Sequence, residues 1–485
     1  MATTLAIRNA LVFDGTGAPP VHGDVAVDGE LIAAIGDIGP VPTSAREIDA
    51  QGLALSPGFV DVHTHDDTAL IVHPGLEFKV AQGCTSLVIG NCGFSSFPSG
   101  ASLMLGGRGD WAGLSGFAEQ VSEHPVACNW VTLVGHNTVR AVVKGDDRGA
   151  PTDAQLDAMR AHVREAMEQG ACGLSSGLIY TPGRWSQTDE VIALAREVTP
   201  FGGLYATHMR NEGDRLLEAV EEALTIAAAA GVPLQISHHK AAGRRNWGKV
   251  TDSLAMVDAA IAGGQDVTLD VYPYIAGSGP MIQYFDLDRI DIELASNIRI
   301  ASCPAFRHYE GWMLVDIADE EGLELDEAVR HVLTAPGGEH TICIQFIMNE
   351  ADIETNLRHP RMMVGSDGIP DLKGMPHPRL FGTFPRILAR YVRERNVLDL
   401  AEAIRRMTSL SCDRFGLTGR GRIAVGGFAD LVLFDPKLVT DVATFDRPKQ
   451  EPVGISLVVV NGQIALESGR HTGAGAGRFV PFRPV

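Results

Sequence analysis

The stretch from Ala54 to Asp67 reads ALSPGFVDVHTHDD, an apolar run that ends in two histidines separated by one residue. A short apolar run with aromatic and β-branched residues is typical of a buried strand. Because alternate side chains of a strand point to the same side, His63 and His65 project together from the end of this one. The stretch therefore predicts a strand that presents two imidazoles at its carboxyl end.

Seven further runs of the same kind follow, and helical patterns separate several of them. One helix is predicted to begin with a capping box, Thr152 to Gln155, and another extends from Asp214 to Ala230 before Gly231. The alternation predicts the α/β class and a (β/α)8 TIM-like barrel. An open doubly wound sheet is the alternative, but no GxGxxG follows the early strands. The other strands are predicted at 85–90, 130–135, 172–175, 204–207, 233–237, 267–271 and 362–366.

The two ends of the chain have a different pattern, with short strands and hairpin turns such as Asp28-Gly29 and Asn461-Gly462. Neither end is long enough to form a good core alone. We expect residues 1–55 and 420–485 to form one small β-sandwich domain, and residues 56–419 to form the barrel. Residues 275–360 are too many for one loop and predict an insertion. The run Gly473 to Gly477 has the composition of a flexible linker.

Composition excludes several classes of function. The 485 residues include 60 acidic and 40 basic ones, giving a formal charge of −20. Such a chain is unsuited to coating nucleic acid or an anionic membrane, because both need basic patches. No run of eighteen apolar residues predicts a membrane span, and the first fifteen residues lack a signal-peptide pattern. The seven scattered cysteines favour a reducing compartment. We expect a cytoplasmic protein and leave a homo-oligomer open.

Histidine, cysteine and aspartate follow five of the predicted barrel strands. In such barrels the functional residues gather at the carboxyl ends of the strands, so we expect these side chains to meet. Imidazole and thiolate ligands together favour Zn²⁺. Spacing alone leaves open whether the first or second histidine of the 238–239 pair is a ligand. The candidates are His63, His65, Cys92, His208, His238, His239 and Asp367.

Eight motifs together resemble those of the amidohydrolase superfamily, in particular its branch of D-aminoacylases, or N-acyl-D-amino-acid deacylases. The resemblance covers essentially the whole chain. The ordered set is much more specific for the branch than for a substrate. The motifs are PGFVDVHTHDD (57–67), GNCGFS (90–95), GHNTVR (135–140), THMRNEG (207–213), ISHHK (236–240), DVYPY (270–274), VGSDG (364–368) and HPRLFGTF (377–384).

The resemblance also implies a site. Cys92, His208 and His238 would hold a tightly bound Zn²⁺, with a weaker second position at His63 and His65. Hydantoinases and dihydroorotases bridge two metals with a modified lysine on strand four, which here reads GLSSGL (173–178) without lysine. Asp367 would be the general acid and base. The residues expected to bind a substrate carboxylate are Tyr180, Lys240, Tyr272, Ser278 and Arg379; Arg379 could instead be a surface cation.

The predicted reaction is zinc-dependent hydrolysis of N-acyl-D-amino acids, with the D preference resting on the resemblance alone. The region after YPY has no Lys or Arg before Arg289, which favours an apolar or aromatic side chain in the substrate. Two enzymatic alternatives are a dipeptidase for C-terminal D-residues and a cyclic amide hydrolase of the hydantoinase or dihydroorotase type. A scaffold without activity is a third, although every expected ligand is present. The loop from Phe94 to Gly116 could cover the barrel mouth.

Overall fold

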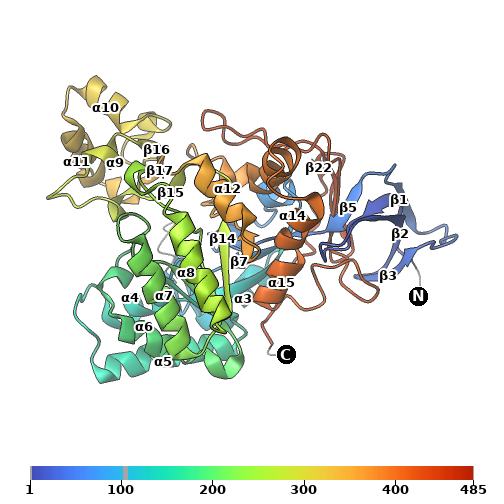
Figure 1. The fold of residues 1–485 in the computed structure, drawn as a ribbon, viewed down its shortest axis with the longest axis horizontal. Helices are drawn as coiled ribbons and strands as arrows, with labels where there is room; N and C mark the ends of the chain where they lie inside the picture. The colour runs from blue at the N-terminus through green and yellow to red at the C-terminus, as the bar shows by residue number, and fades with distance from the viewer. Residues whose placement is uncertain (1–2, 102–107, 484–485) are drawn as a thin grey trace.

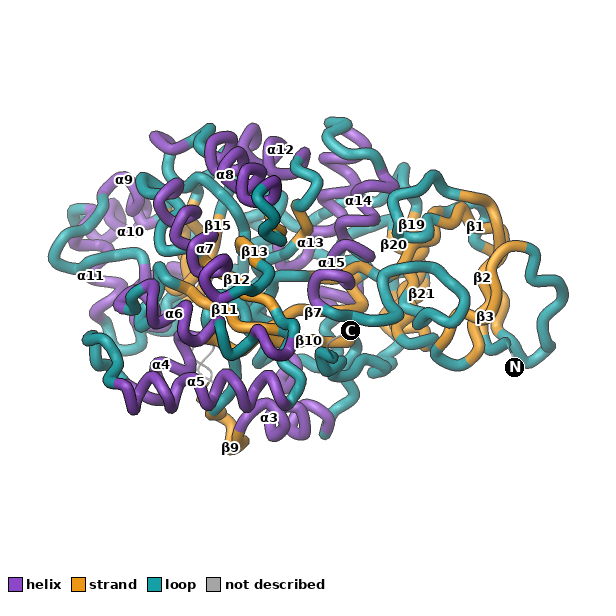
Figure 2. The backbone as a smooth tube through the Cα atoms, turned by 60° about the horizontal axis from the view of Figure 1, so that its bottom comes forward, coloured by secondary structure: helices purple, strands orange, loops and turns teal. Residues whose placement is uncertain are grey.

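The computed structural model describes residues 3–101 and 108–483. Its centre is a ring of eight parallel strands that lie side by side in chain order, surrounded by helices (Figures 1 and 2). A bridge between Thr64 and Gly368 joins the first strand to the last. The predicted (β/α)8 barrel is therefore confirmed. Its strands are β6 (Phe59–Asp61), β7 (Cys84–Ile89), β10 (Asn129–Gly135), β11 (Gly173–Gly177), β12 (Leu204–His208), β13 (Leu234–Ile236), β14 (Val267–Val271) and β18 (Met362–Val364).

The barrel helices bury their apolar stripes against these strands. The predicted capping box is present at Thr152, and Gly231 ends its helix in the left-handed conformation that favours glycine. Helix α12, the last helix before β18, packs on helix α8 and on the strands β14 and β18. The helices are α1 (Ala69–Val72), α2 (Glu77–Val80), α3 (Gly113–Ser122), α4 (His136–Lys144), α5 (Asp153–Glu168), α6 (Thr188–Ala195), α7 (Leu216–Ala230), α8 (Val250–Ala262), α12 (Glu350–Arg358), α13 (Arg379–Arg386), α14 (Leu400–Met407) and α15 (Ser409–Phe415).

The first predicted strand is divided in the structure. Its first part, β5 (Ala54–Pro57), belongs to a second sheet, and only β6 belongs to the barrel. Gly58 separates them, and a Cβ atom there would lie 2.1 Å from Oγ1 of Thr85. The chain crosses between the two sheets at a point where only glycine fits, and an apolar pattern does not reveal such a crossing.

Both chain ends contribute to that second, nine-stranded sheet, which lies at one side of the barrel (Figure 1). Strands β5 and β19 pair antiparallel and join the two ends. Its core includes Ile7, Val25, Leu431 and Val459. The domain boundaries at residues 55 and 420 stay a prediction. The strands besides β5 are β1 (Leu5–Val12), β2 (Val21–Asp28), β3 (Leu31–Gly36), β4 (Arg46–Asp49), β19 (Leu431–Phe434), β20 (Ile455–Val460), β21 (Gln463–Glu467) and β22 (Arg470–His471).

The glycine-rich tail is packed, so the prediction of a flexible linker is wrong. Cβ atoms at Gly475 and Gly477 would lie 2.1 Å from Pro125 and from the Cys128 carbonyl oxygen. The N–H of Gly477 donates to the carbonyl of Val126 at 2.8 Å. Small residues occur here because the tail runs against the barrel backbone.

A small subdomain lies between β14 and β18, where the sequence predicted an insertion. A three-stranded sheet and three helices surround a core of their own and form one corner of the molecule (Figure 1). Its elements are β15 (Gly277–Pro280), α9 (Ile292–Ala295), β16 (Ile298–Ser302), α10 (Leu314–Glu321), α11 (Leu325–Thr334) and β17 (Ile342–Gln345).

The loop expected to cover the mouth contains the hairpin β8 (Ser99–Ala101) and β9 (Arg108–Ala112). Residues 102–107, which include Gly106 and Gly107, lie outside the described residues. Across the described part of the chain, no helix has both the length and the apolar character needed to cross a membrane.

Candidate metal centre

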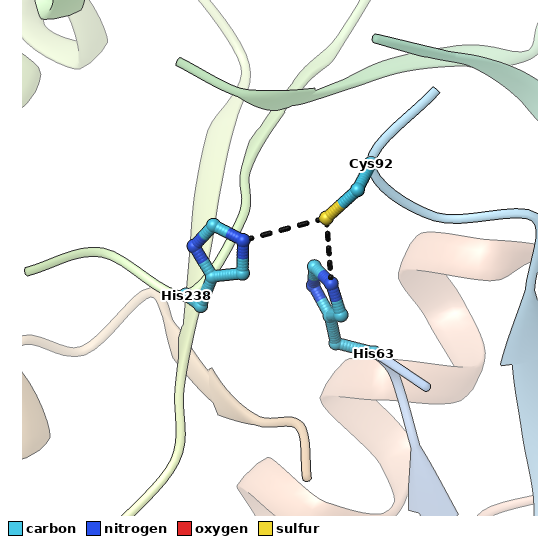
Figure 3. Close-up of side chains that lie close together, drawn as sticks. All are labelled: His63, Cys92 and His238. Atoms are coloured by element: carbon cyan, nitrogen blue, oxygen red, sulfur yellow. Dashed lines mark hydrogen bonds between the residues drawn. The ribbon is translucent and has the colours of Figure 1, made fainter. Parts of the chain in front are cut away.

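The thiol of Cys92 is the centre of the site. Its Sγ atom lies 3.3 Å from Nε2 of His63, 3.4 Å from Nε2 of His238 and 3.6 Å from Nδ1 of His208. All four side chains are buried. Figure 3 shows the rings of His63 and His238 on two sides of this sulfur. The four residues come from or directly follow β6, β7, β12 and β13, so the barrel brings together groups that are far apart in the sequence.

Unusual backbone geometry directs three site residues inward. Cys92, His238 and Asp367 have φ angles of 55°, 32° and 49°, which residues other than glycine rarely adopt. Such conformations persist where the surrounding structure enforces them, and they cluster at functional sites. Gly177 packs directly against the backbone of Cys92, because a Cβ atom at position 177 would lie 2.1 Å from the carbonyl oxygen of Cys92.

A second group shares His63 with the first. Nε2 of His65 lies 3.1 Å from Oδ1 of Asp367, and Nε2 of His63 lies 3.6 Å from the same oxygen. The potential ligand atoms of these three residues all lie within 4.8 Å of one another, as do those of His63, Cys92 and His238. Two adjoining positions for a cation result, one beside the thiol and one beside the Asp367 carboxylate.

The donor set fits zinc. Burial by itself would raise the pKa of the Cys92 thiol, but the neighbouring imidazoles of His63 and His238 hold that pKa well below its usual range. A thiolate surrounded by ring nitrogens is a ligand set of the kind that binds Zn²⁺. Cys92, His208 and His238 would hold one ion, with His63, His65 and Asp367 beside it.

Glu212 is a site residue that the sequence reasoning missed. Its carboxylate lies 2.9 Å from Nδ1 of His238 and 3.4 Å from Nε2 of His208, the ring nitrogens that face away from Cys92. Burial would raise the pKa of Glu212, but His208, Lys240 and His238 outweigh it and lower that pKa well below the usual range. A carboxylate behind a ligand histidine fixes the ring's tautomer and orientation.

The cation of Lys240 occupies the space behind the same histidines. Its Nζ lies 2.6 Å from Glu212 and 2.7 Å from Nδ1 of His238. Glu212, His208 and His238 are close enough together to bind a metal, but the ammonium already neutralises this carboxylate. We therefore interpret the group as support for the centre and not as a third metal position.

Asp270 is the second residue that was missed. Its Oδ1 accepts a hydrogen bond from the N–H of His238 at 2.8 Å and lies 3.3 Å from Nδ1 of His63. It is also buried. Both missed carboxylates lie within quoted motifs, THMRNEG and DVYPY. An acidic residue on a buried strand or just beyond its end was the available signal for them.

His239 has a different environment from His238. Its Nδ1 lies 2.8 Å from Oδ1 of Asn356 and its Nε2 lies 2.8 Å from Oγ of Ser253, so both ring nitrogens have partners on the helices outside the barrel. Burial lowers the pKa of His239 to about 4. Of the two histidines that spacing left open, the geometry brings only His238 to Cys92.

Arg379 lies beneath the mouth and not on the surface. Its side chain is fully buried, its Nη2 lies 2.9 Å from Oδ2 of Asp367, and its guanidinium covers the ring of Tyr272 at 4.4 Å. The same Nη2 donates to the carbonyl oxygen of Ser278 at 3.2 Å, so Ser278 contributes through its backbone. Neither Nε nor Nη1 of Arg379 has a hydrogen-bond acceptor among the described residues. Two buried donors suit an anionic group.

A cavity of about 430 Å³ opens beside the centre, between the barrel loops and the inserted subdomain. His65 and Asp367 contribute to its wall, and Tyr180 lines it with its hydroxyl 3.3 Å from that of Tyr284. The ring of Tyr180 also packs edge-on against His208. The apolar part of the lining consists of Phe94, Ala141, Pro182, Pro280, Ile282 and Ile369.

Fold and site together define a (β/α)8-barrel protein with a histidine and cysteine metal centre at its mouth. The model of the Amidohydrolase family matches residues 46–279 and 299–466. The chain belongs to this family, as its motifs predicted, and within it to the branch of D-aminoacylases and N-acyl-D-amino-acid deacylases.

The relatives support this placement along the whole chain. A D-aminoacylase from Alcaligenes xylosoxydans xylosoxydans is 40% identical, over 98% of this chain and 97% of that protein. An N-acyl-D-aspartate deacylase from the same organism is 42% identical, over 96% and 93%. The crystal structure of an N-acyl-D-glutamate deacylase from Bordetella bronchiseptica, with zinc and a phosphonate mimic of the tetrahedral intermediate, superposes with a TM-score of 0.92. That protein is 37% identical, with 99% of this chain and 100% of the other covered.

Proposed function

We propose that this protein is a zinc-dependent N-acyl-D-amino-acid deacylase, which hydrolyses the amide to a carboxylate and a free D-amino acid. The observation that carries the proposal is the buried thiol and imidazole cluster directly beside the Asp367–Arg379 ion pair. It combines metal ligands, an acid-base carboxylate and an anion-binding cation at one mouth. The relatives that match over the full length support the substrate class.

Zinc, when bound, supplies a Lewis acid for the amide carbonyl and lowers the pKa of water to about 7. Cys92, His208 and His238 would hold the tighter ion. His63, His65 and Asp367 would form a weaker second position. Glu212 and Asp270 keep the ligand rings oriented.

Asp367 is the proposed proton carrier. Burial would raise its pKa, but the Arg379 guanidinium and the hydrogen bond from His65 hold that pKa well below the usual range, so the group is ionised at neutral pH. An ionised carboxylate can accept a proton from the attacking water and donate it to the leaving nitrogen. Its Oδ1 faces the histidines and its Oδ2 faces Arg379, so both oxygens are oriented.

Arg379 is the main candidate for the substrate carboxylate, since two of its donors lack partners among the described residues. Tyr272 fixes the guanidinium from one face. Lys240 adds positive charge but is already paired with Glu212. Tyr180 and Ser278 line the cavity and would contact the substrate bound in it.

The cavity supports an apolar or aromatic side chain. Among its described lining residues are Phe94, Ile282 and Ile369 but no Lys or Arg, and the acidic residues Asp146 and Glu339 also line it. An acidic side chain would meet no Lys or Arg among the described lining residues. The similarity to an N-acyl-D-aspartate deacylase favours the opposite preference, so the side chain must be measured.

The test is free-amine release by the zinc-loaded protein from N-acetyl derivatives of Phe, Leu, Met, Glu and Asp, each as the D and the L form. We expect turnover of the apolar D compounds. Turnover of D-Glu or D-Asp would refute the pocket argument, and turnover of L compounds would refute the stereochemistry. Activity only on dipeptides with a C-terminal D-residue, or only on hydantoins, would select one of the alternatives.

We further propose a cytoplasmic location, on the ground that all seven cysteines are free and buried. The small β-sandwich domain is proposed to comprise residues 1–55 and 420–485. A homo-oligomer stays open, and light scattering after gel filtration measures it directly.

A further inference from the structure

Lys79 is a fully buried lysine on the short helix α2, and buried lysines are rare unless they are paired. Its Nζ lies 2.6 Å from Oδ2 of Asp61, 3.0 Å from Oγ1 of Thr64 and 2.8 Å from Oγ of Ser366. An ammonium has three N–H donors, so these three oxygens satisfy it. A second buried carboxylate, Asp66, lies 3.2 Å away.

These partners belong to the two segments that close the barrel, residues 61–66, which begin at the last residue of β6, and residues 366–368 after β18. We call the contact between them the seam. Oδ1 of Asp61 accepts from the N–H of Ser366 at 2.8 Å and from the N–H of His63 at 3.3 Å. One carboxylate therefore binds both sides of the seam through one oxygen and Lys79 through the other.

The residues of the metal centre alternate with those of the seam. The N–H of Asp367 donates to the carbonyl of His63 at 2.7 Å, and the N–H of His65 donates to the carbonyl of Gly368 at 3.0 Å. His63, His65 and Asp367 are therefore held by backbone hydrogen bonds across the seam, and the side chains of Lys79 and Asp61 bind the same two segments. Cys92, His208 and His238 come from other strands and have no bond to Lys79 among the described residues.

We propose that Lys79 is a positioning residue, which fastens the seam and so sets the places of His63, His65 and Asp367 relative to the Cys92 thiolate. The inference rests on the proposed function, since it concerns the geometry of that centre. It predicts a selective defect. The proton carrier and the weaker metal position should suffer, whereas the tighter ligand set should not.

The test uses the triple variant Lys79→Met/Asp61→Asn/Asp66→Asn. It removes the lysine and both carboxylates beside it together, because removing only some of these charges would leave an unpaired buried charge. The oxygen of the new amide at position 61 can still accept from the N–H groups of His63 and Ser366. The matched control is Arg420→Met/Asp430→Asn, which removes another buried ion pair, in a region remote from the metal centre.

The measurements are kcat and KM on the best substrate, zinc affinities by chelator competition, and the melting temperature. We expect kcat about 100-fold lower, since small misplacements of catalytic groups have effects of this size, with KM within about threefold. The affinity for the more tightly bound zinc ion should equal that of the unaltered protein. The affinity for a second, more weakly bound zinc ion should fall about tenfold or more. The control variant should have a lower melting temperature and an unchanged kcat.

Two outcomes would overturn the inference. One is a kcat within threefold of the control, and the other is an equal loss of the tight and the weak zinc. If the triple variant does not fold, Ser366→Ala removes one of the three acceptors of Lys79, and a kcat equal to that of the unaltered protein would overturn the inference. A protein that binds zinc but cleaves no N-acyl-D-amino acid refutes the proposed function instead, and the zinc affinities still test Lys79.

Discussion

Asp367 and Arg379 form a buried ion pair, with Oδ2 of the carboxylate 2.9 Å from Nη2 of the guanidinium. The proposed proton carrier and the proposed carboxylate receptor are thus in direct contact. Their charges are coupled, because Arg379 lowers the pKa of Asp367. A substrate carboxylate that approaches the free donors of Arg379 lies next to the group that moves the proton, which links binding to orientation of the reacting amide.

Replacing Asp367 by Asn should abolish most of the turnover while leaving the tight zinc in place. The amide keeps the shape of the side chain and one acceptor oxygen but cannot carry the proton, and general acid-base catalysis contributes roughly 10²–10⁴-fold. Steady-state kinetics and the zinc content of the purified protein check the two parts. If the variant retains more than about a tenth of the activity, Asp367 is not the base.

Replacing Arg379 by Met should weaken recognition of the substrate carboxylate. A charge-assisted hydrogen bond contributes about 1.5–3 kcal/mol, which corresponds to roughly tenfold to a hundredfold in KM. The matched comparison is a substrate whose carboxylate is replaced by a carboxamide. The variant should lose most of the preference for the acid over the amide, whereas an equal loss on both substrates would assign Arg379 only to orienting Asp367.

Replacing Glu212 by Gln should lower zinc affinity by about 10–100-fold, the usual effect of changing a carboxylate behind a ligand histidine. The variant removes the charge that orients His208 and His238 and leaves Lys240 without its anion. Chelator competition measures the affinity. Activity should return when zinc is added in excess, and a failure to recover would mean that Glu212 has a role beyond holding the metal.

Period-two alternation was enough to predict that His63 and His65 face one way, and the order of strands was enough to bring Cys92, His208 and Asp367 to one mouth. Other features depend on the backbone. His238, and not His239, contacts Cys92, and His238 has a left-handed φ angle that spacing does not encode. The division at Gly58 and the packed tail depend on contacts with distant residues, which a local pattern does not contain.

The same reasoning explains why the supporting carboxylates were missed. Glu212 lies beside a ring nitrogen of His238, and Asp270 accepts a hydrogen bond from the backbone N–H of the same histidine. Strand-end positions identify the ligands but not the groups behind them. The role of Lys79 could not be predicted from the sequence, because a lysine on a short helix is typical of a surface residue. Only its three hydrogen-bond partners in the structure explain its burial.

The adjacent histidines provide a matched pair of variants for the last prediction. His238→Asn should remove a nitrogen that lies 3.4 Å from the Cys92 sulfur, and should therefore lose the tight zinc and the activity together. His239→Asn breaks hydrogen bonds to Asn356 and Ser253 and should lower the melting temperature instead. Zinc should remain near the amount found in the unaltered protein, because neither ring nitrogen of His239 faces the centre. Metal analysis of the two folded variants decides between the neighbours, and zinc lost from His239→Asn but kept by His238→Asn would reverse the assignment.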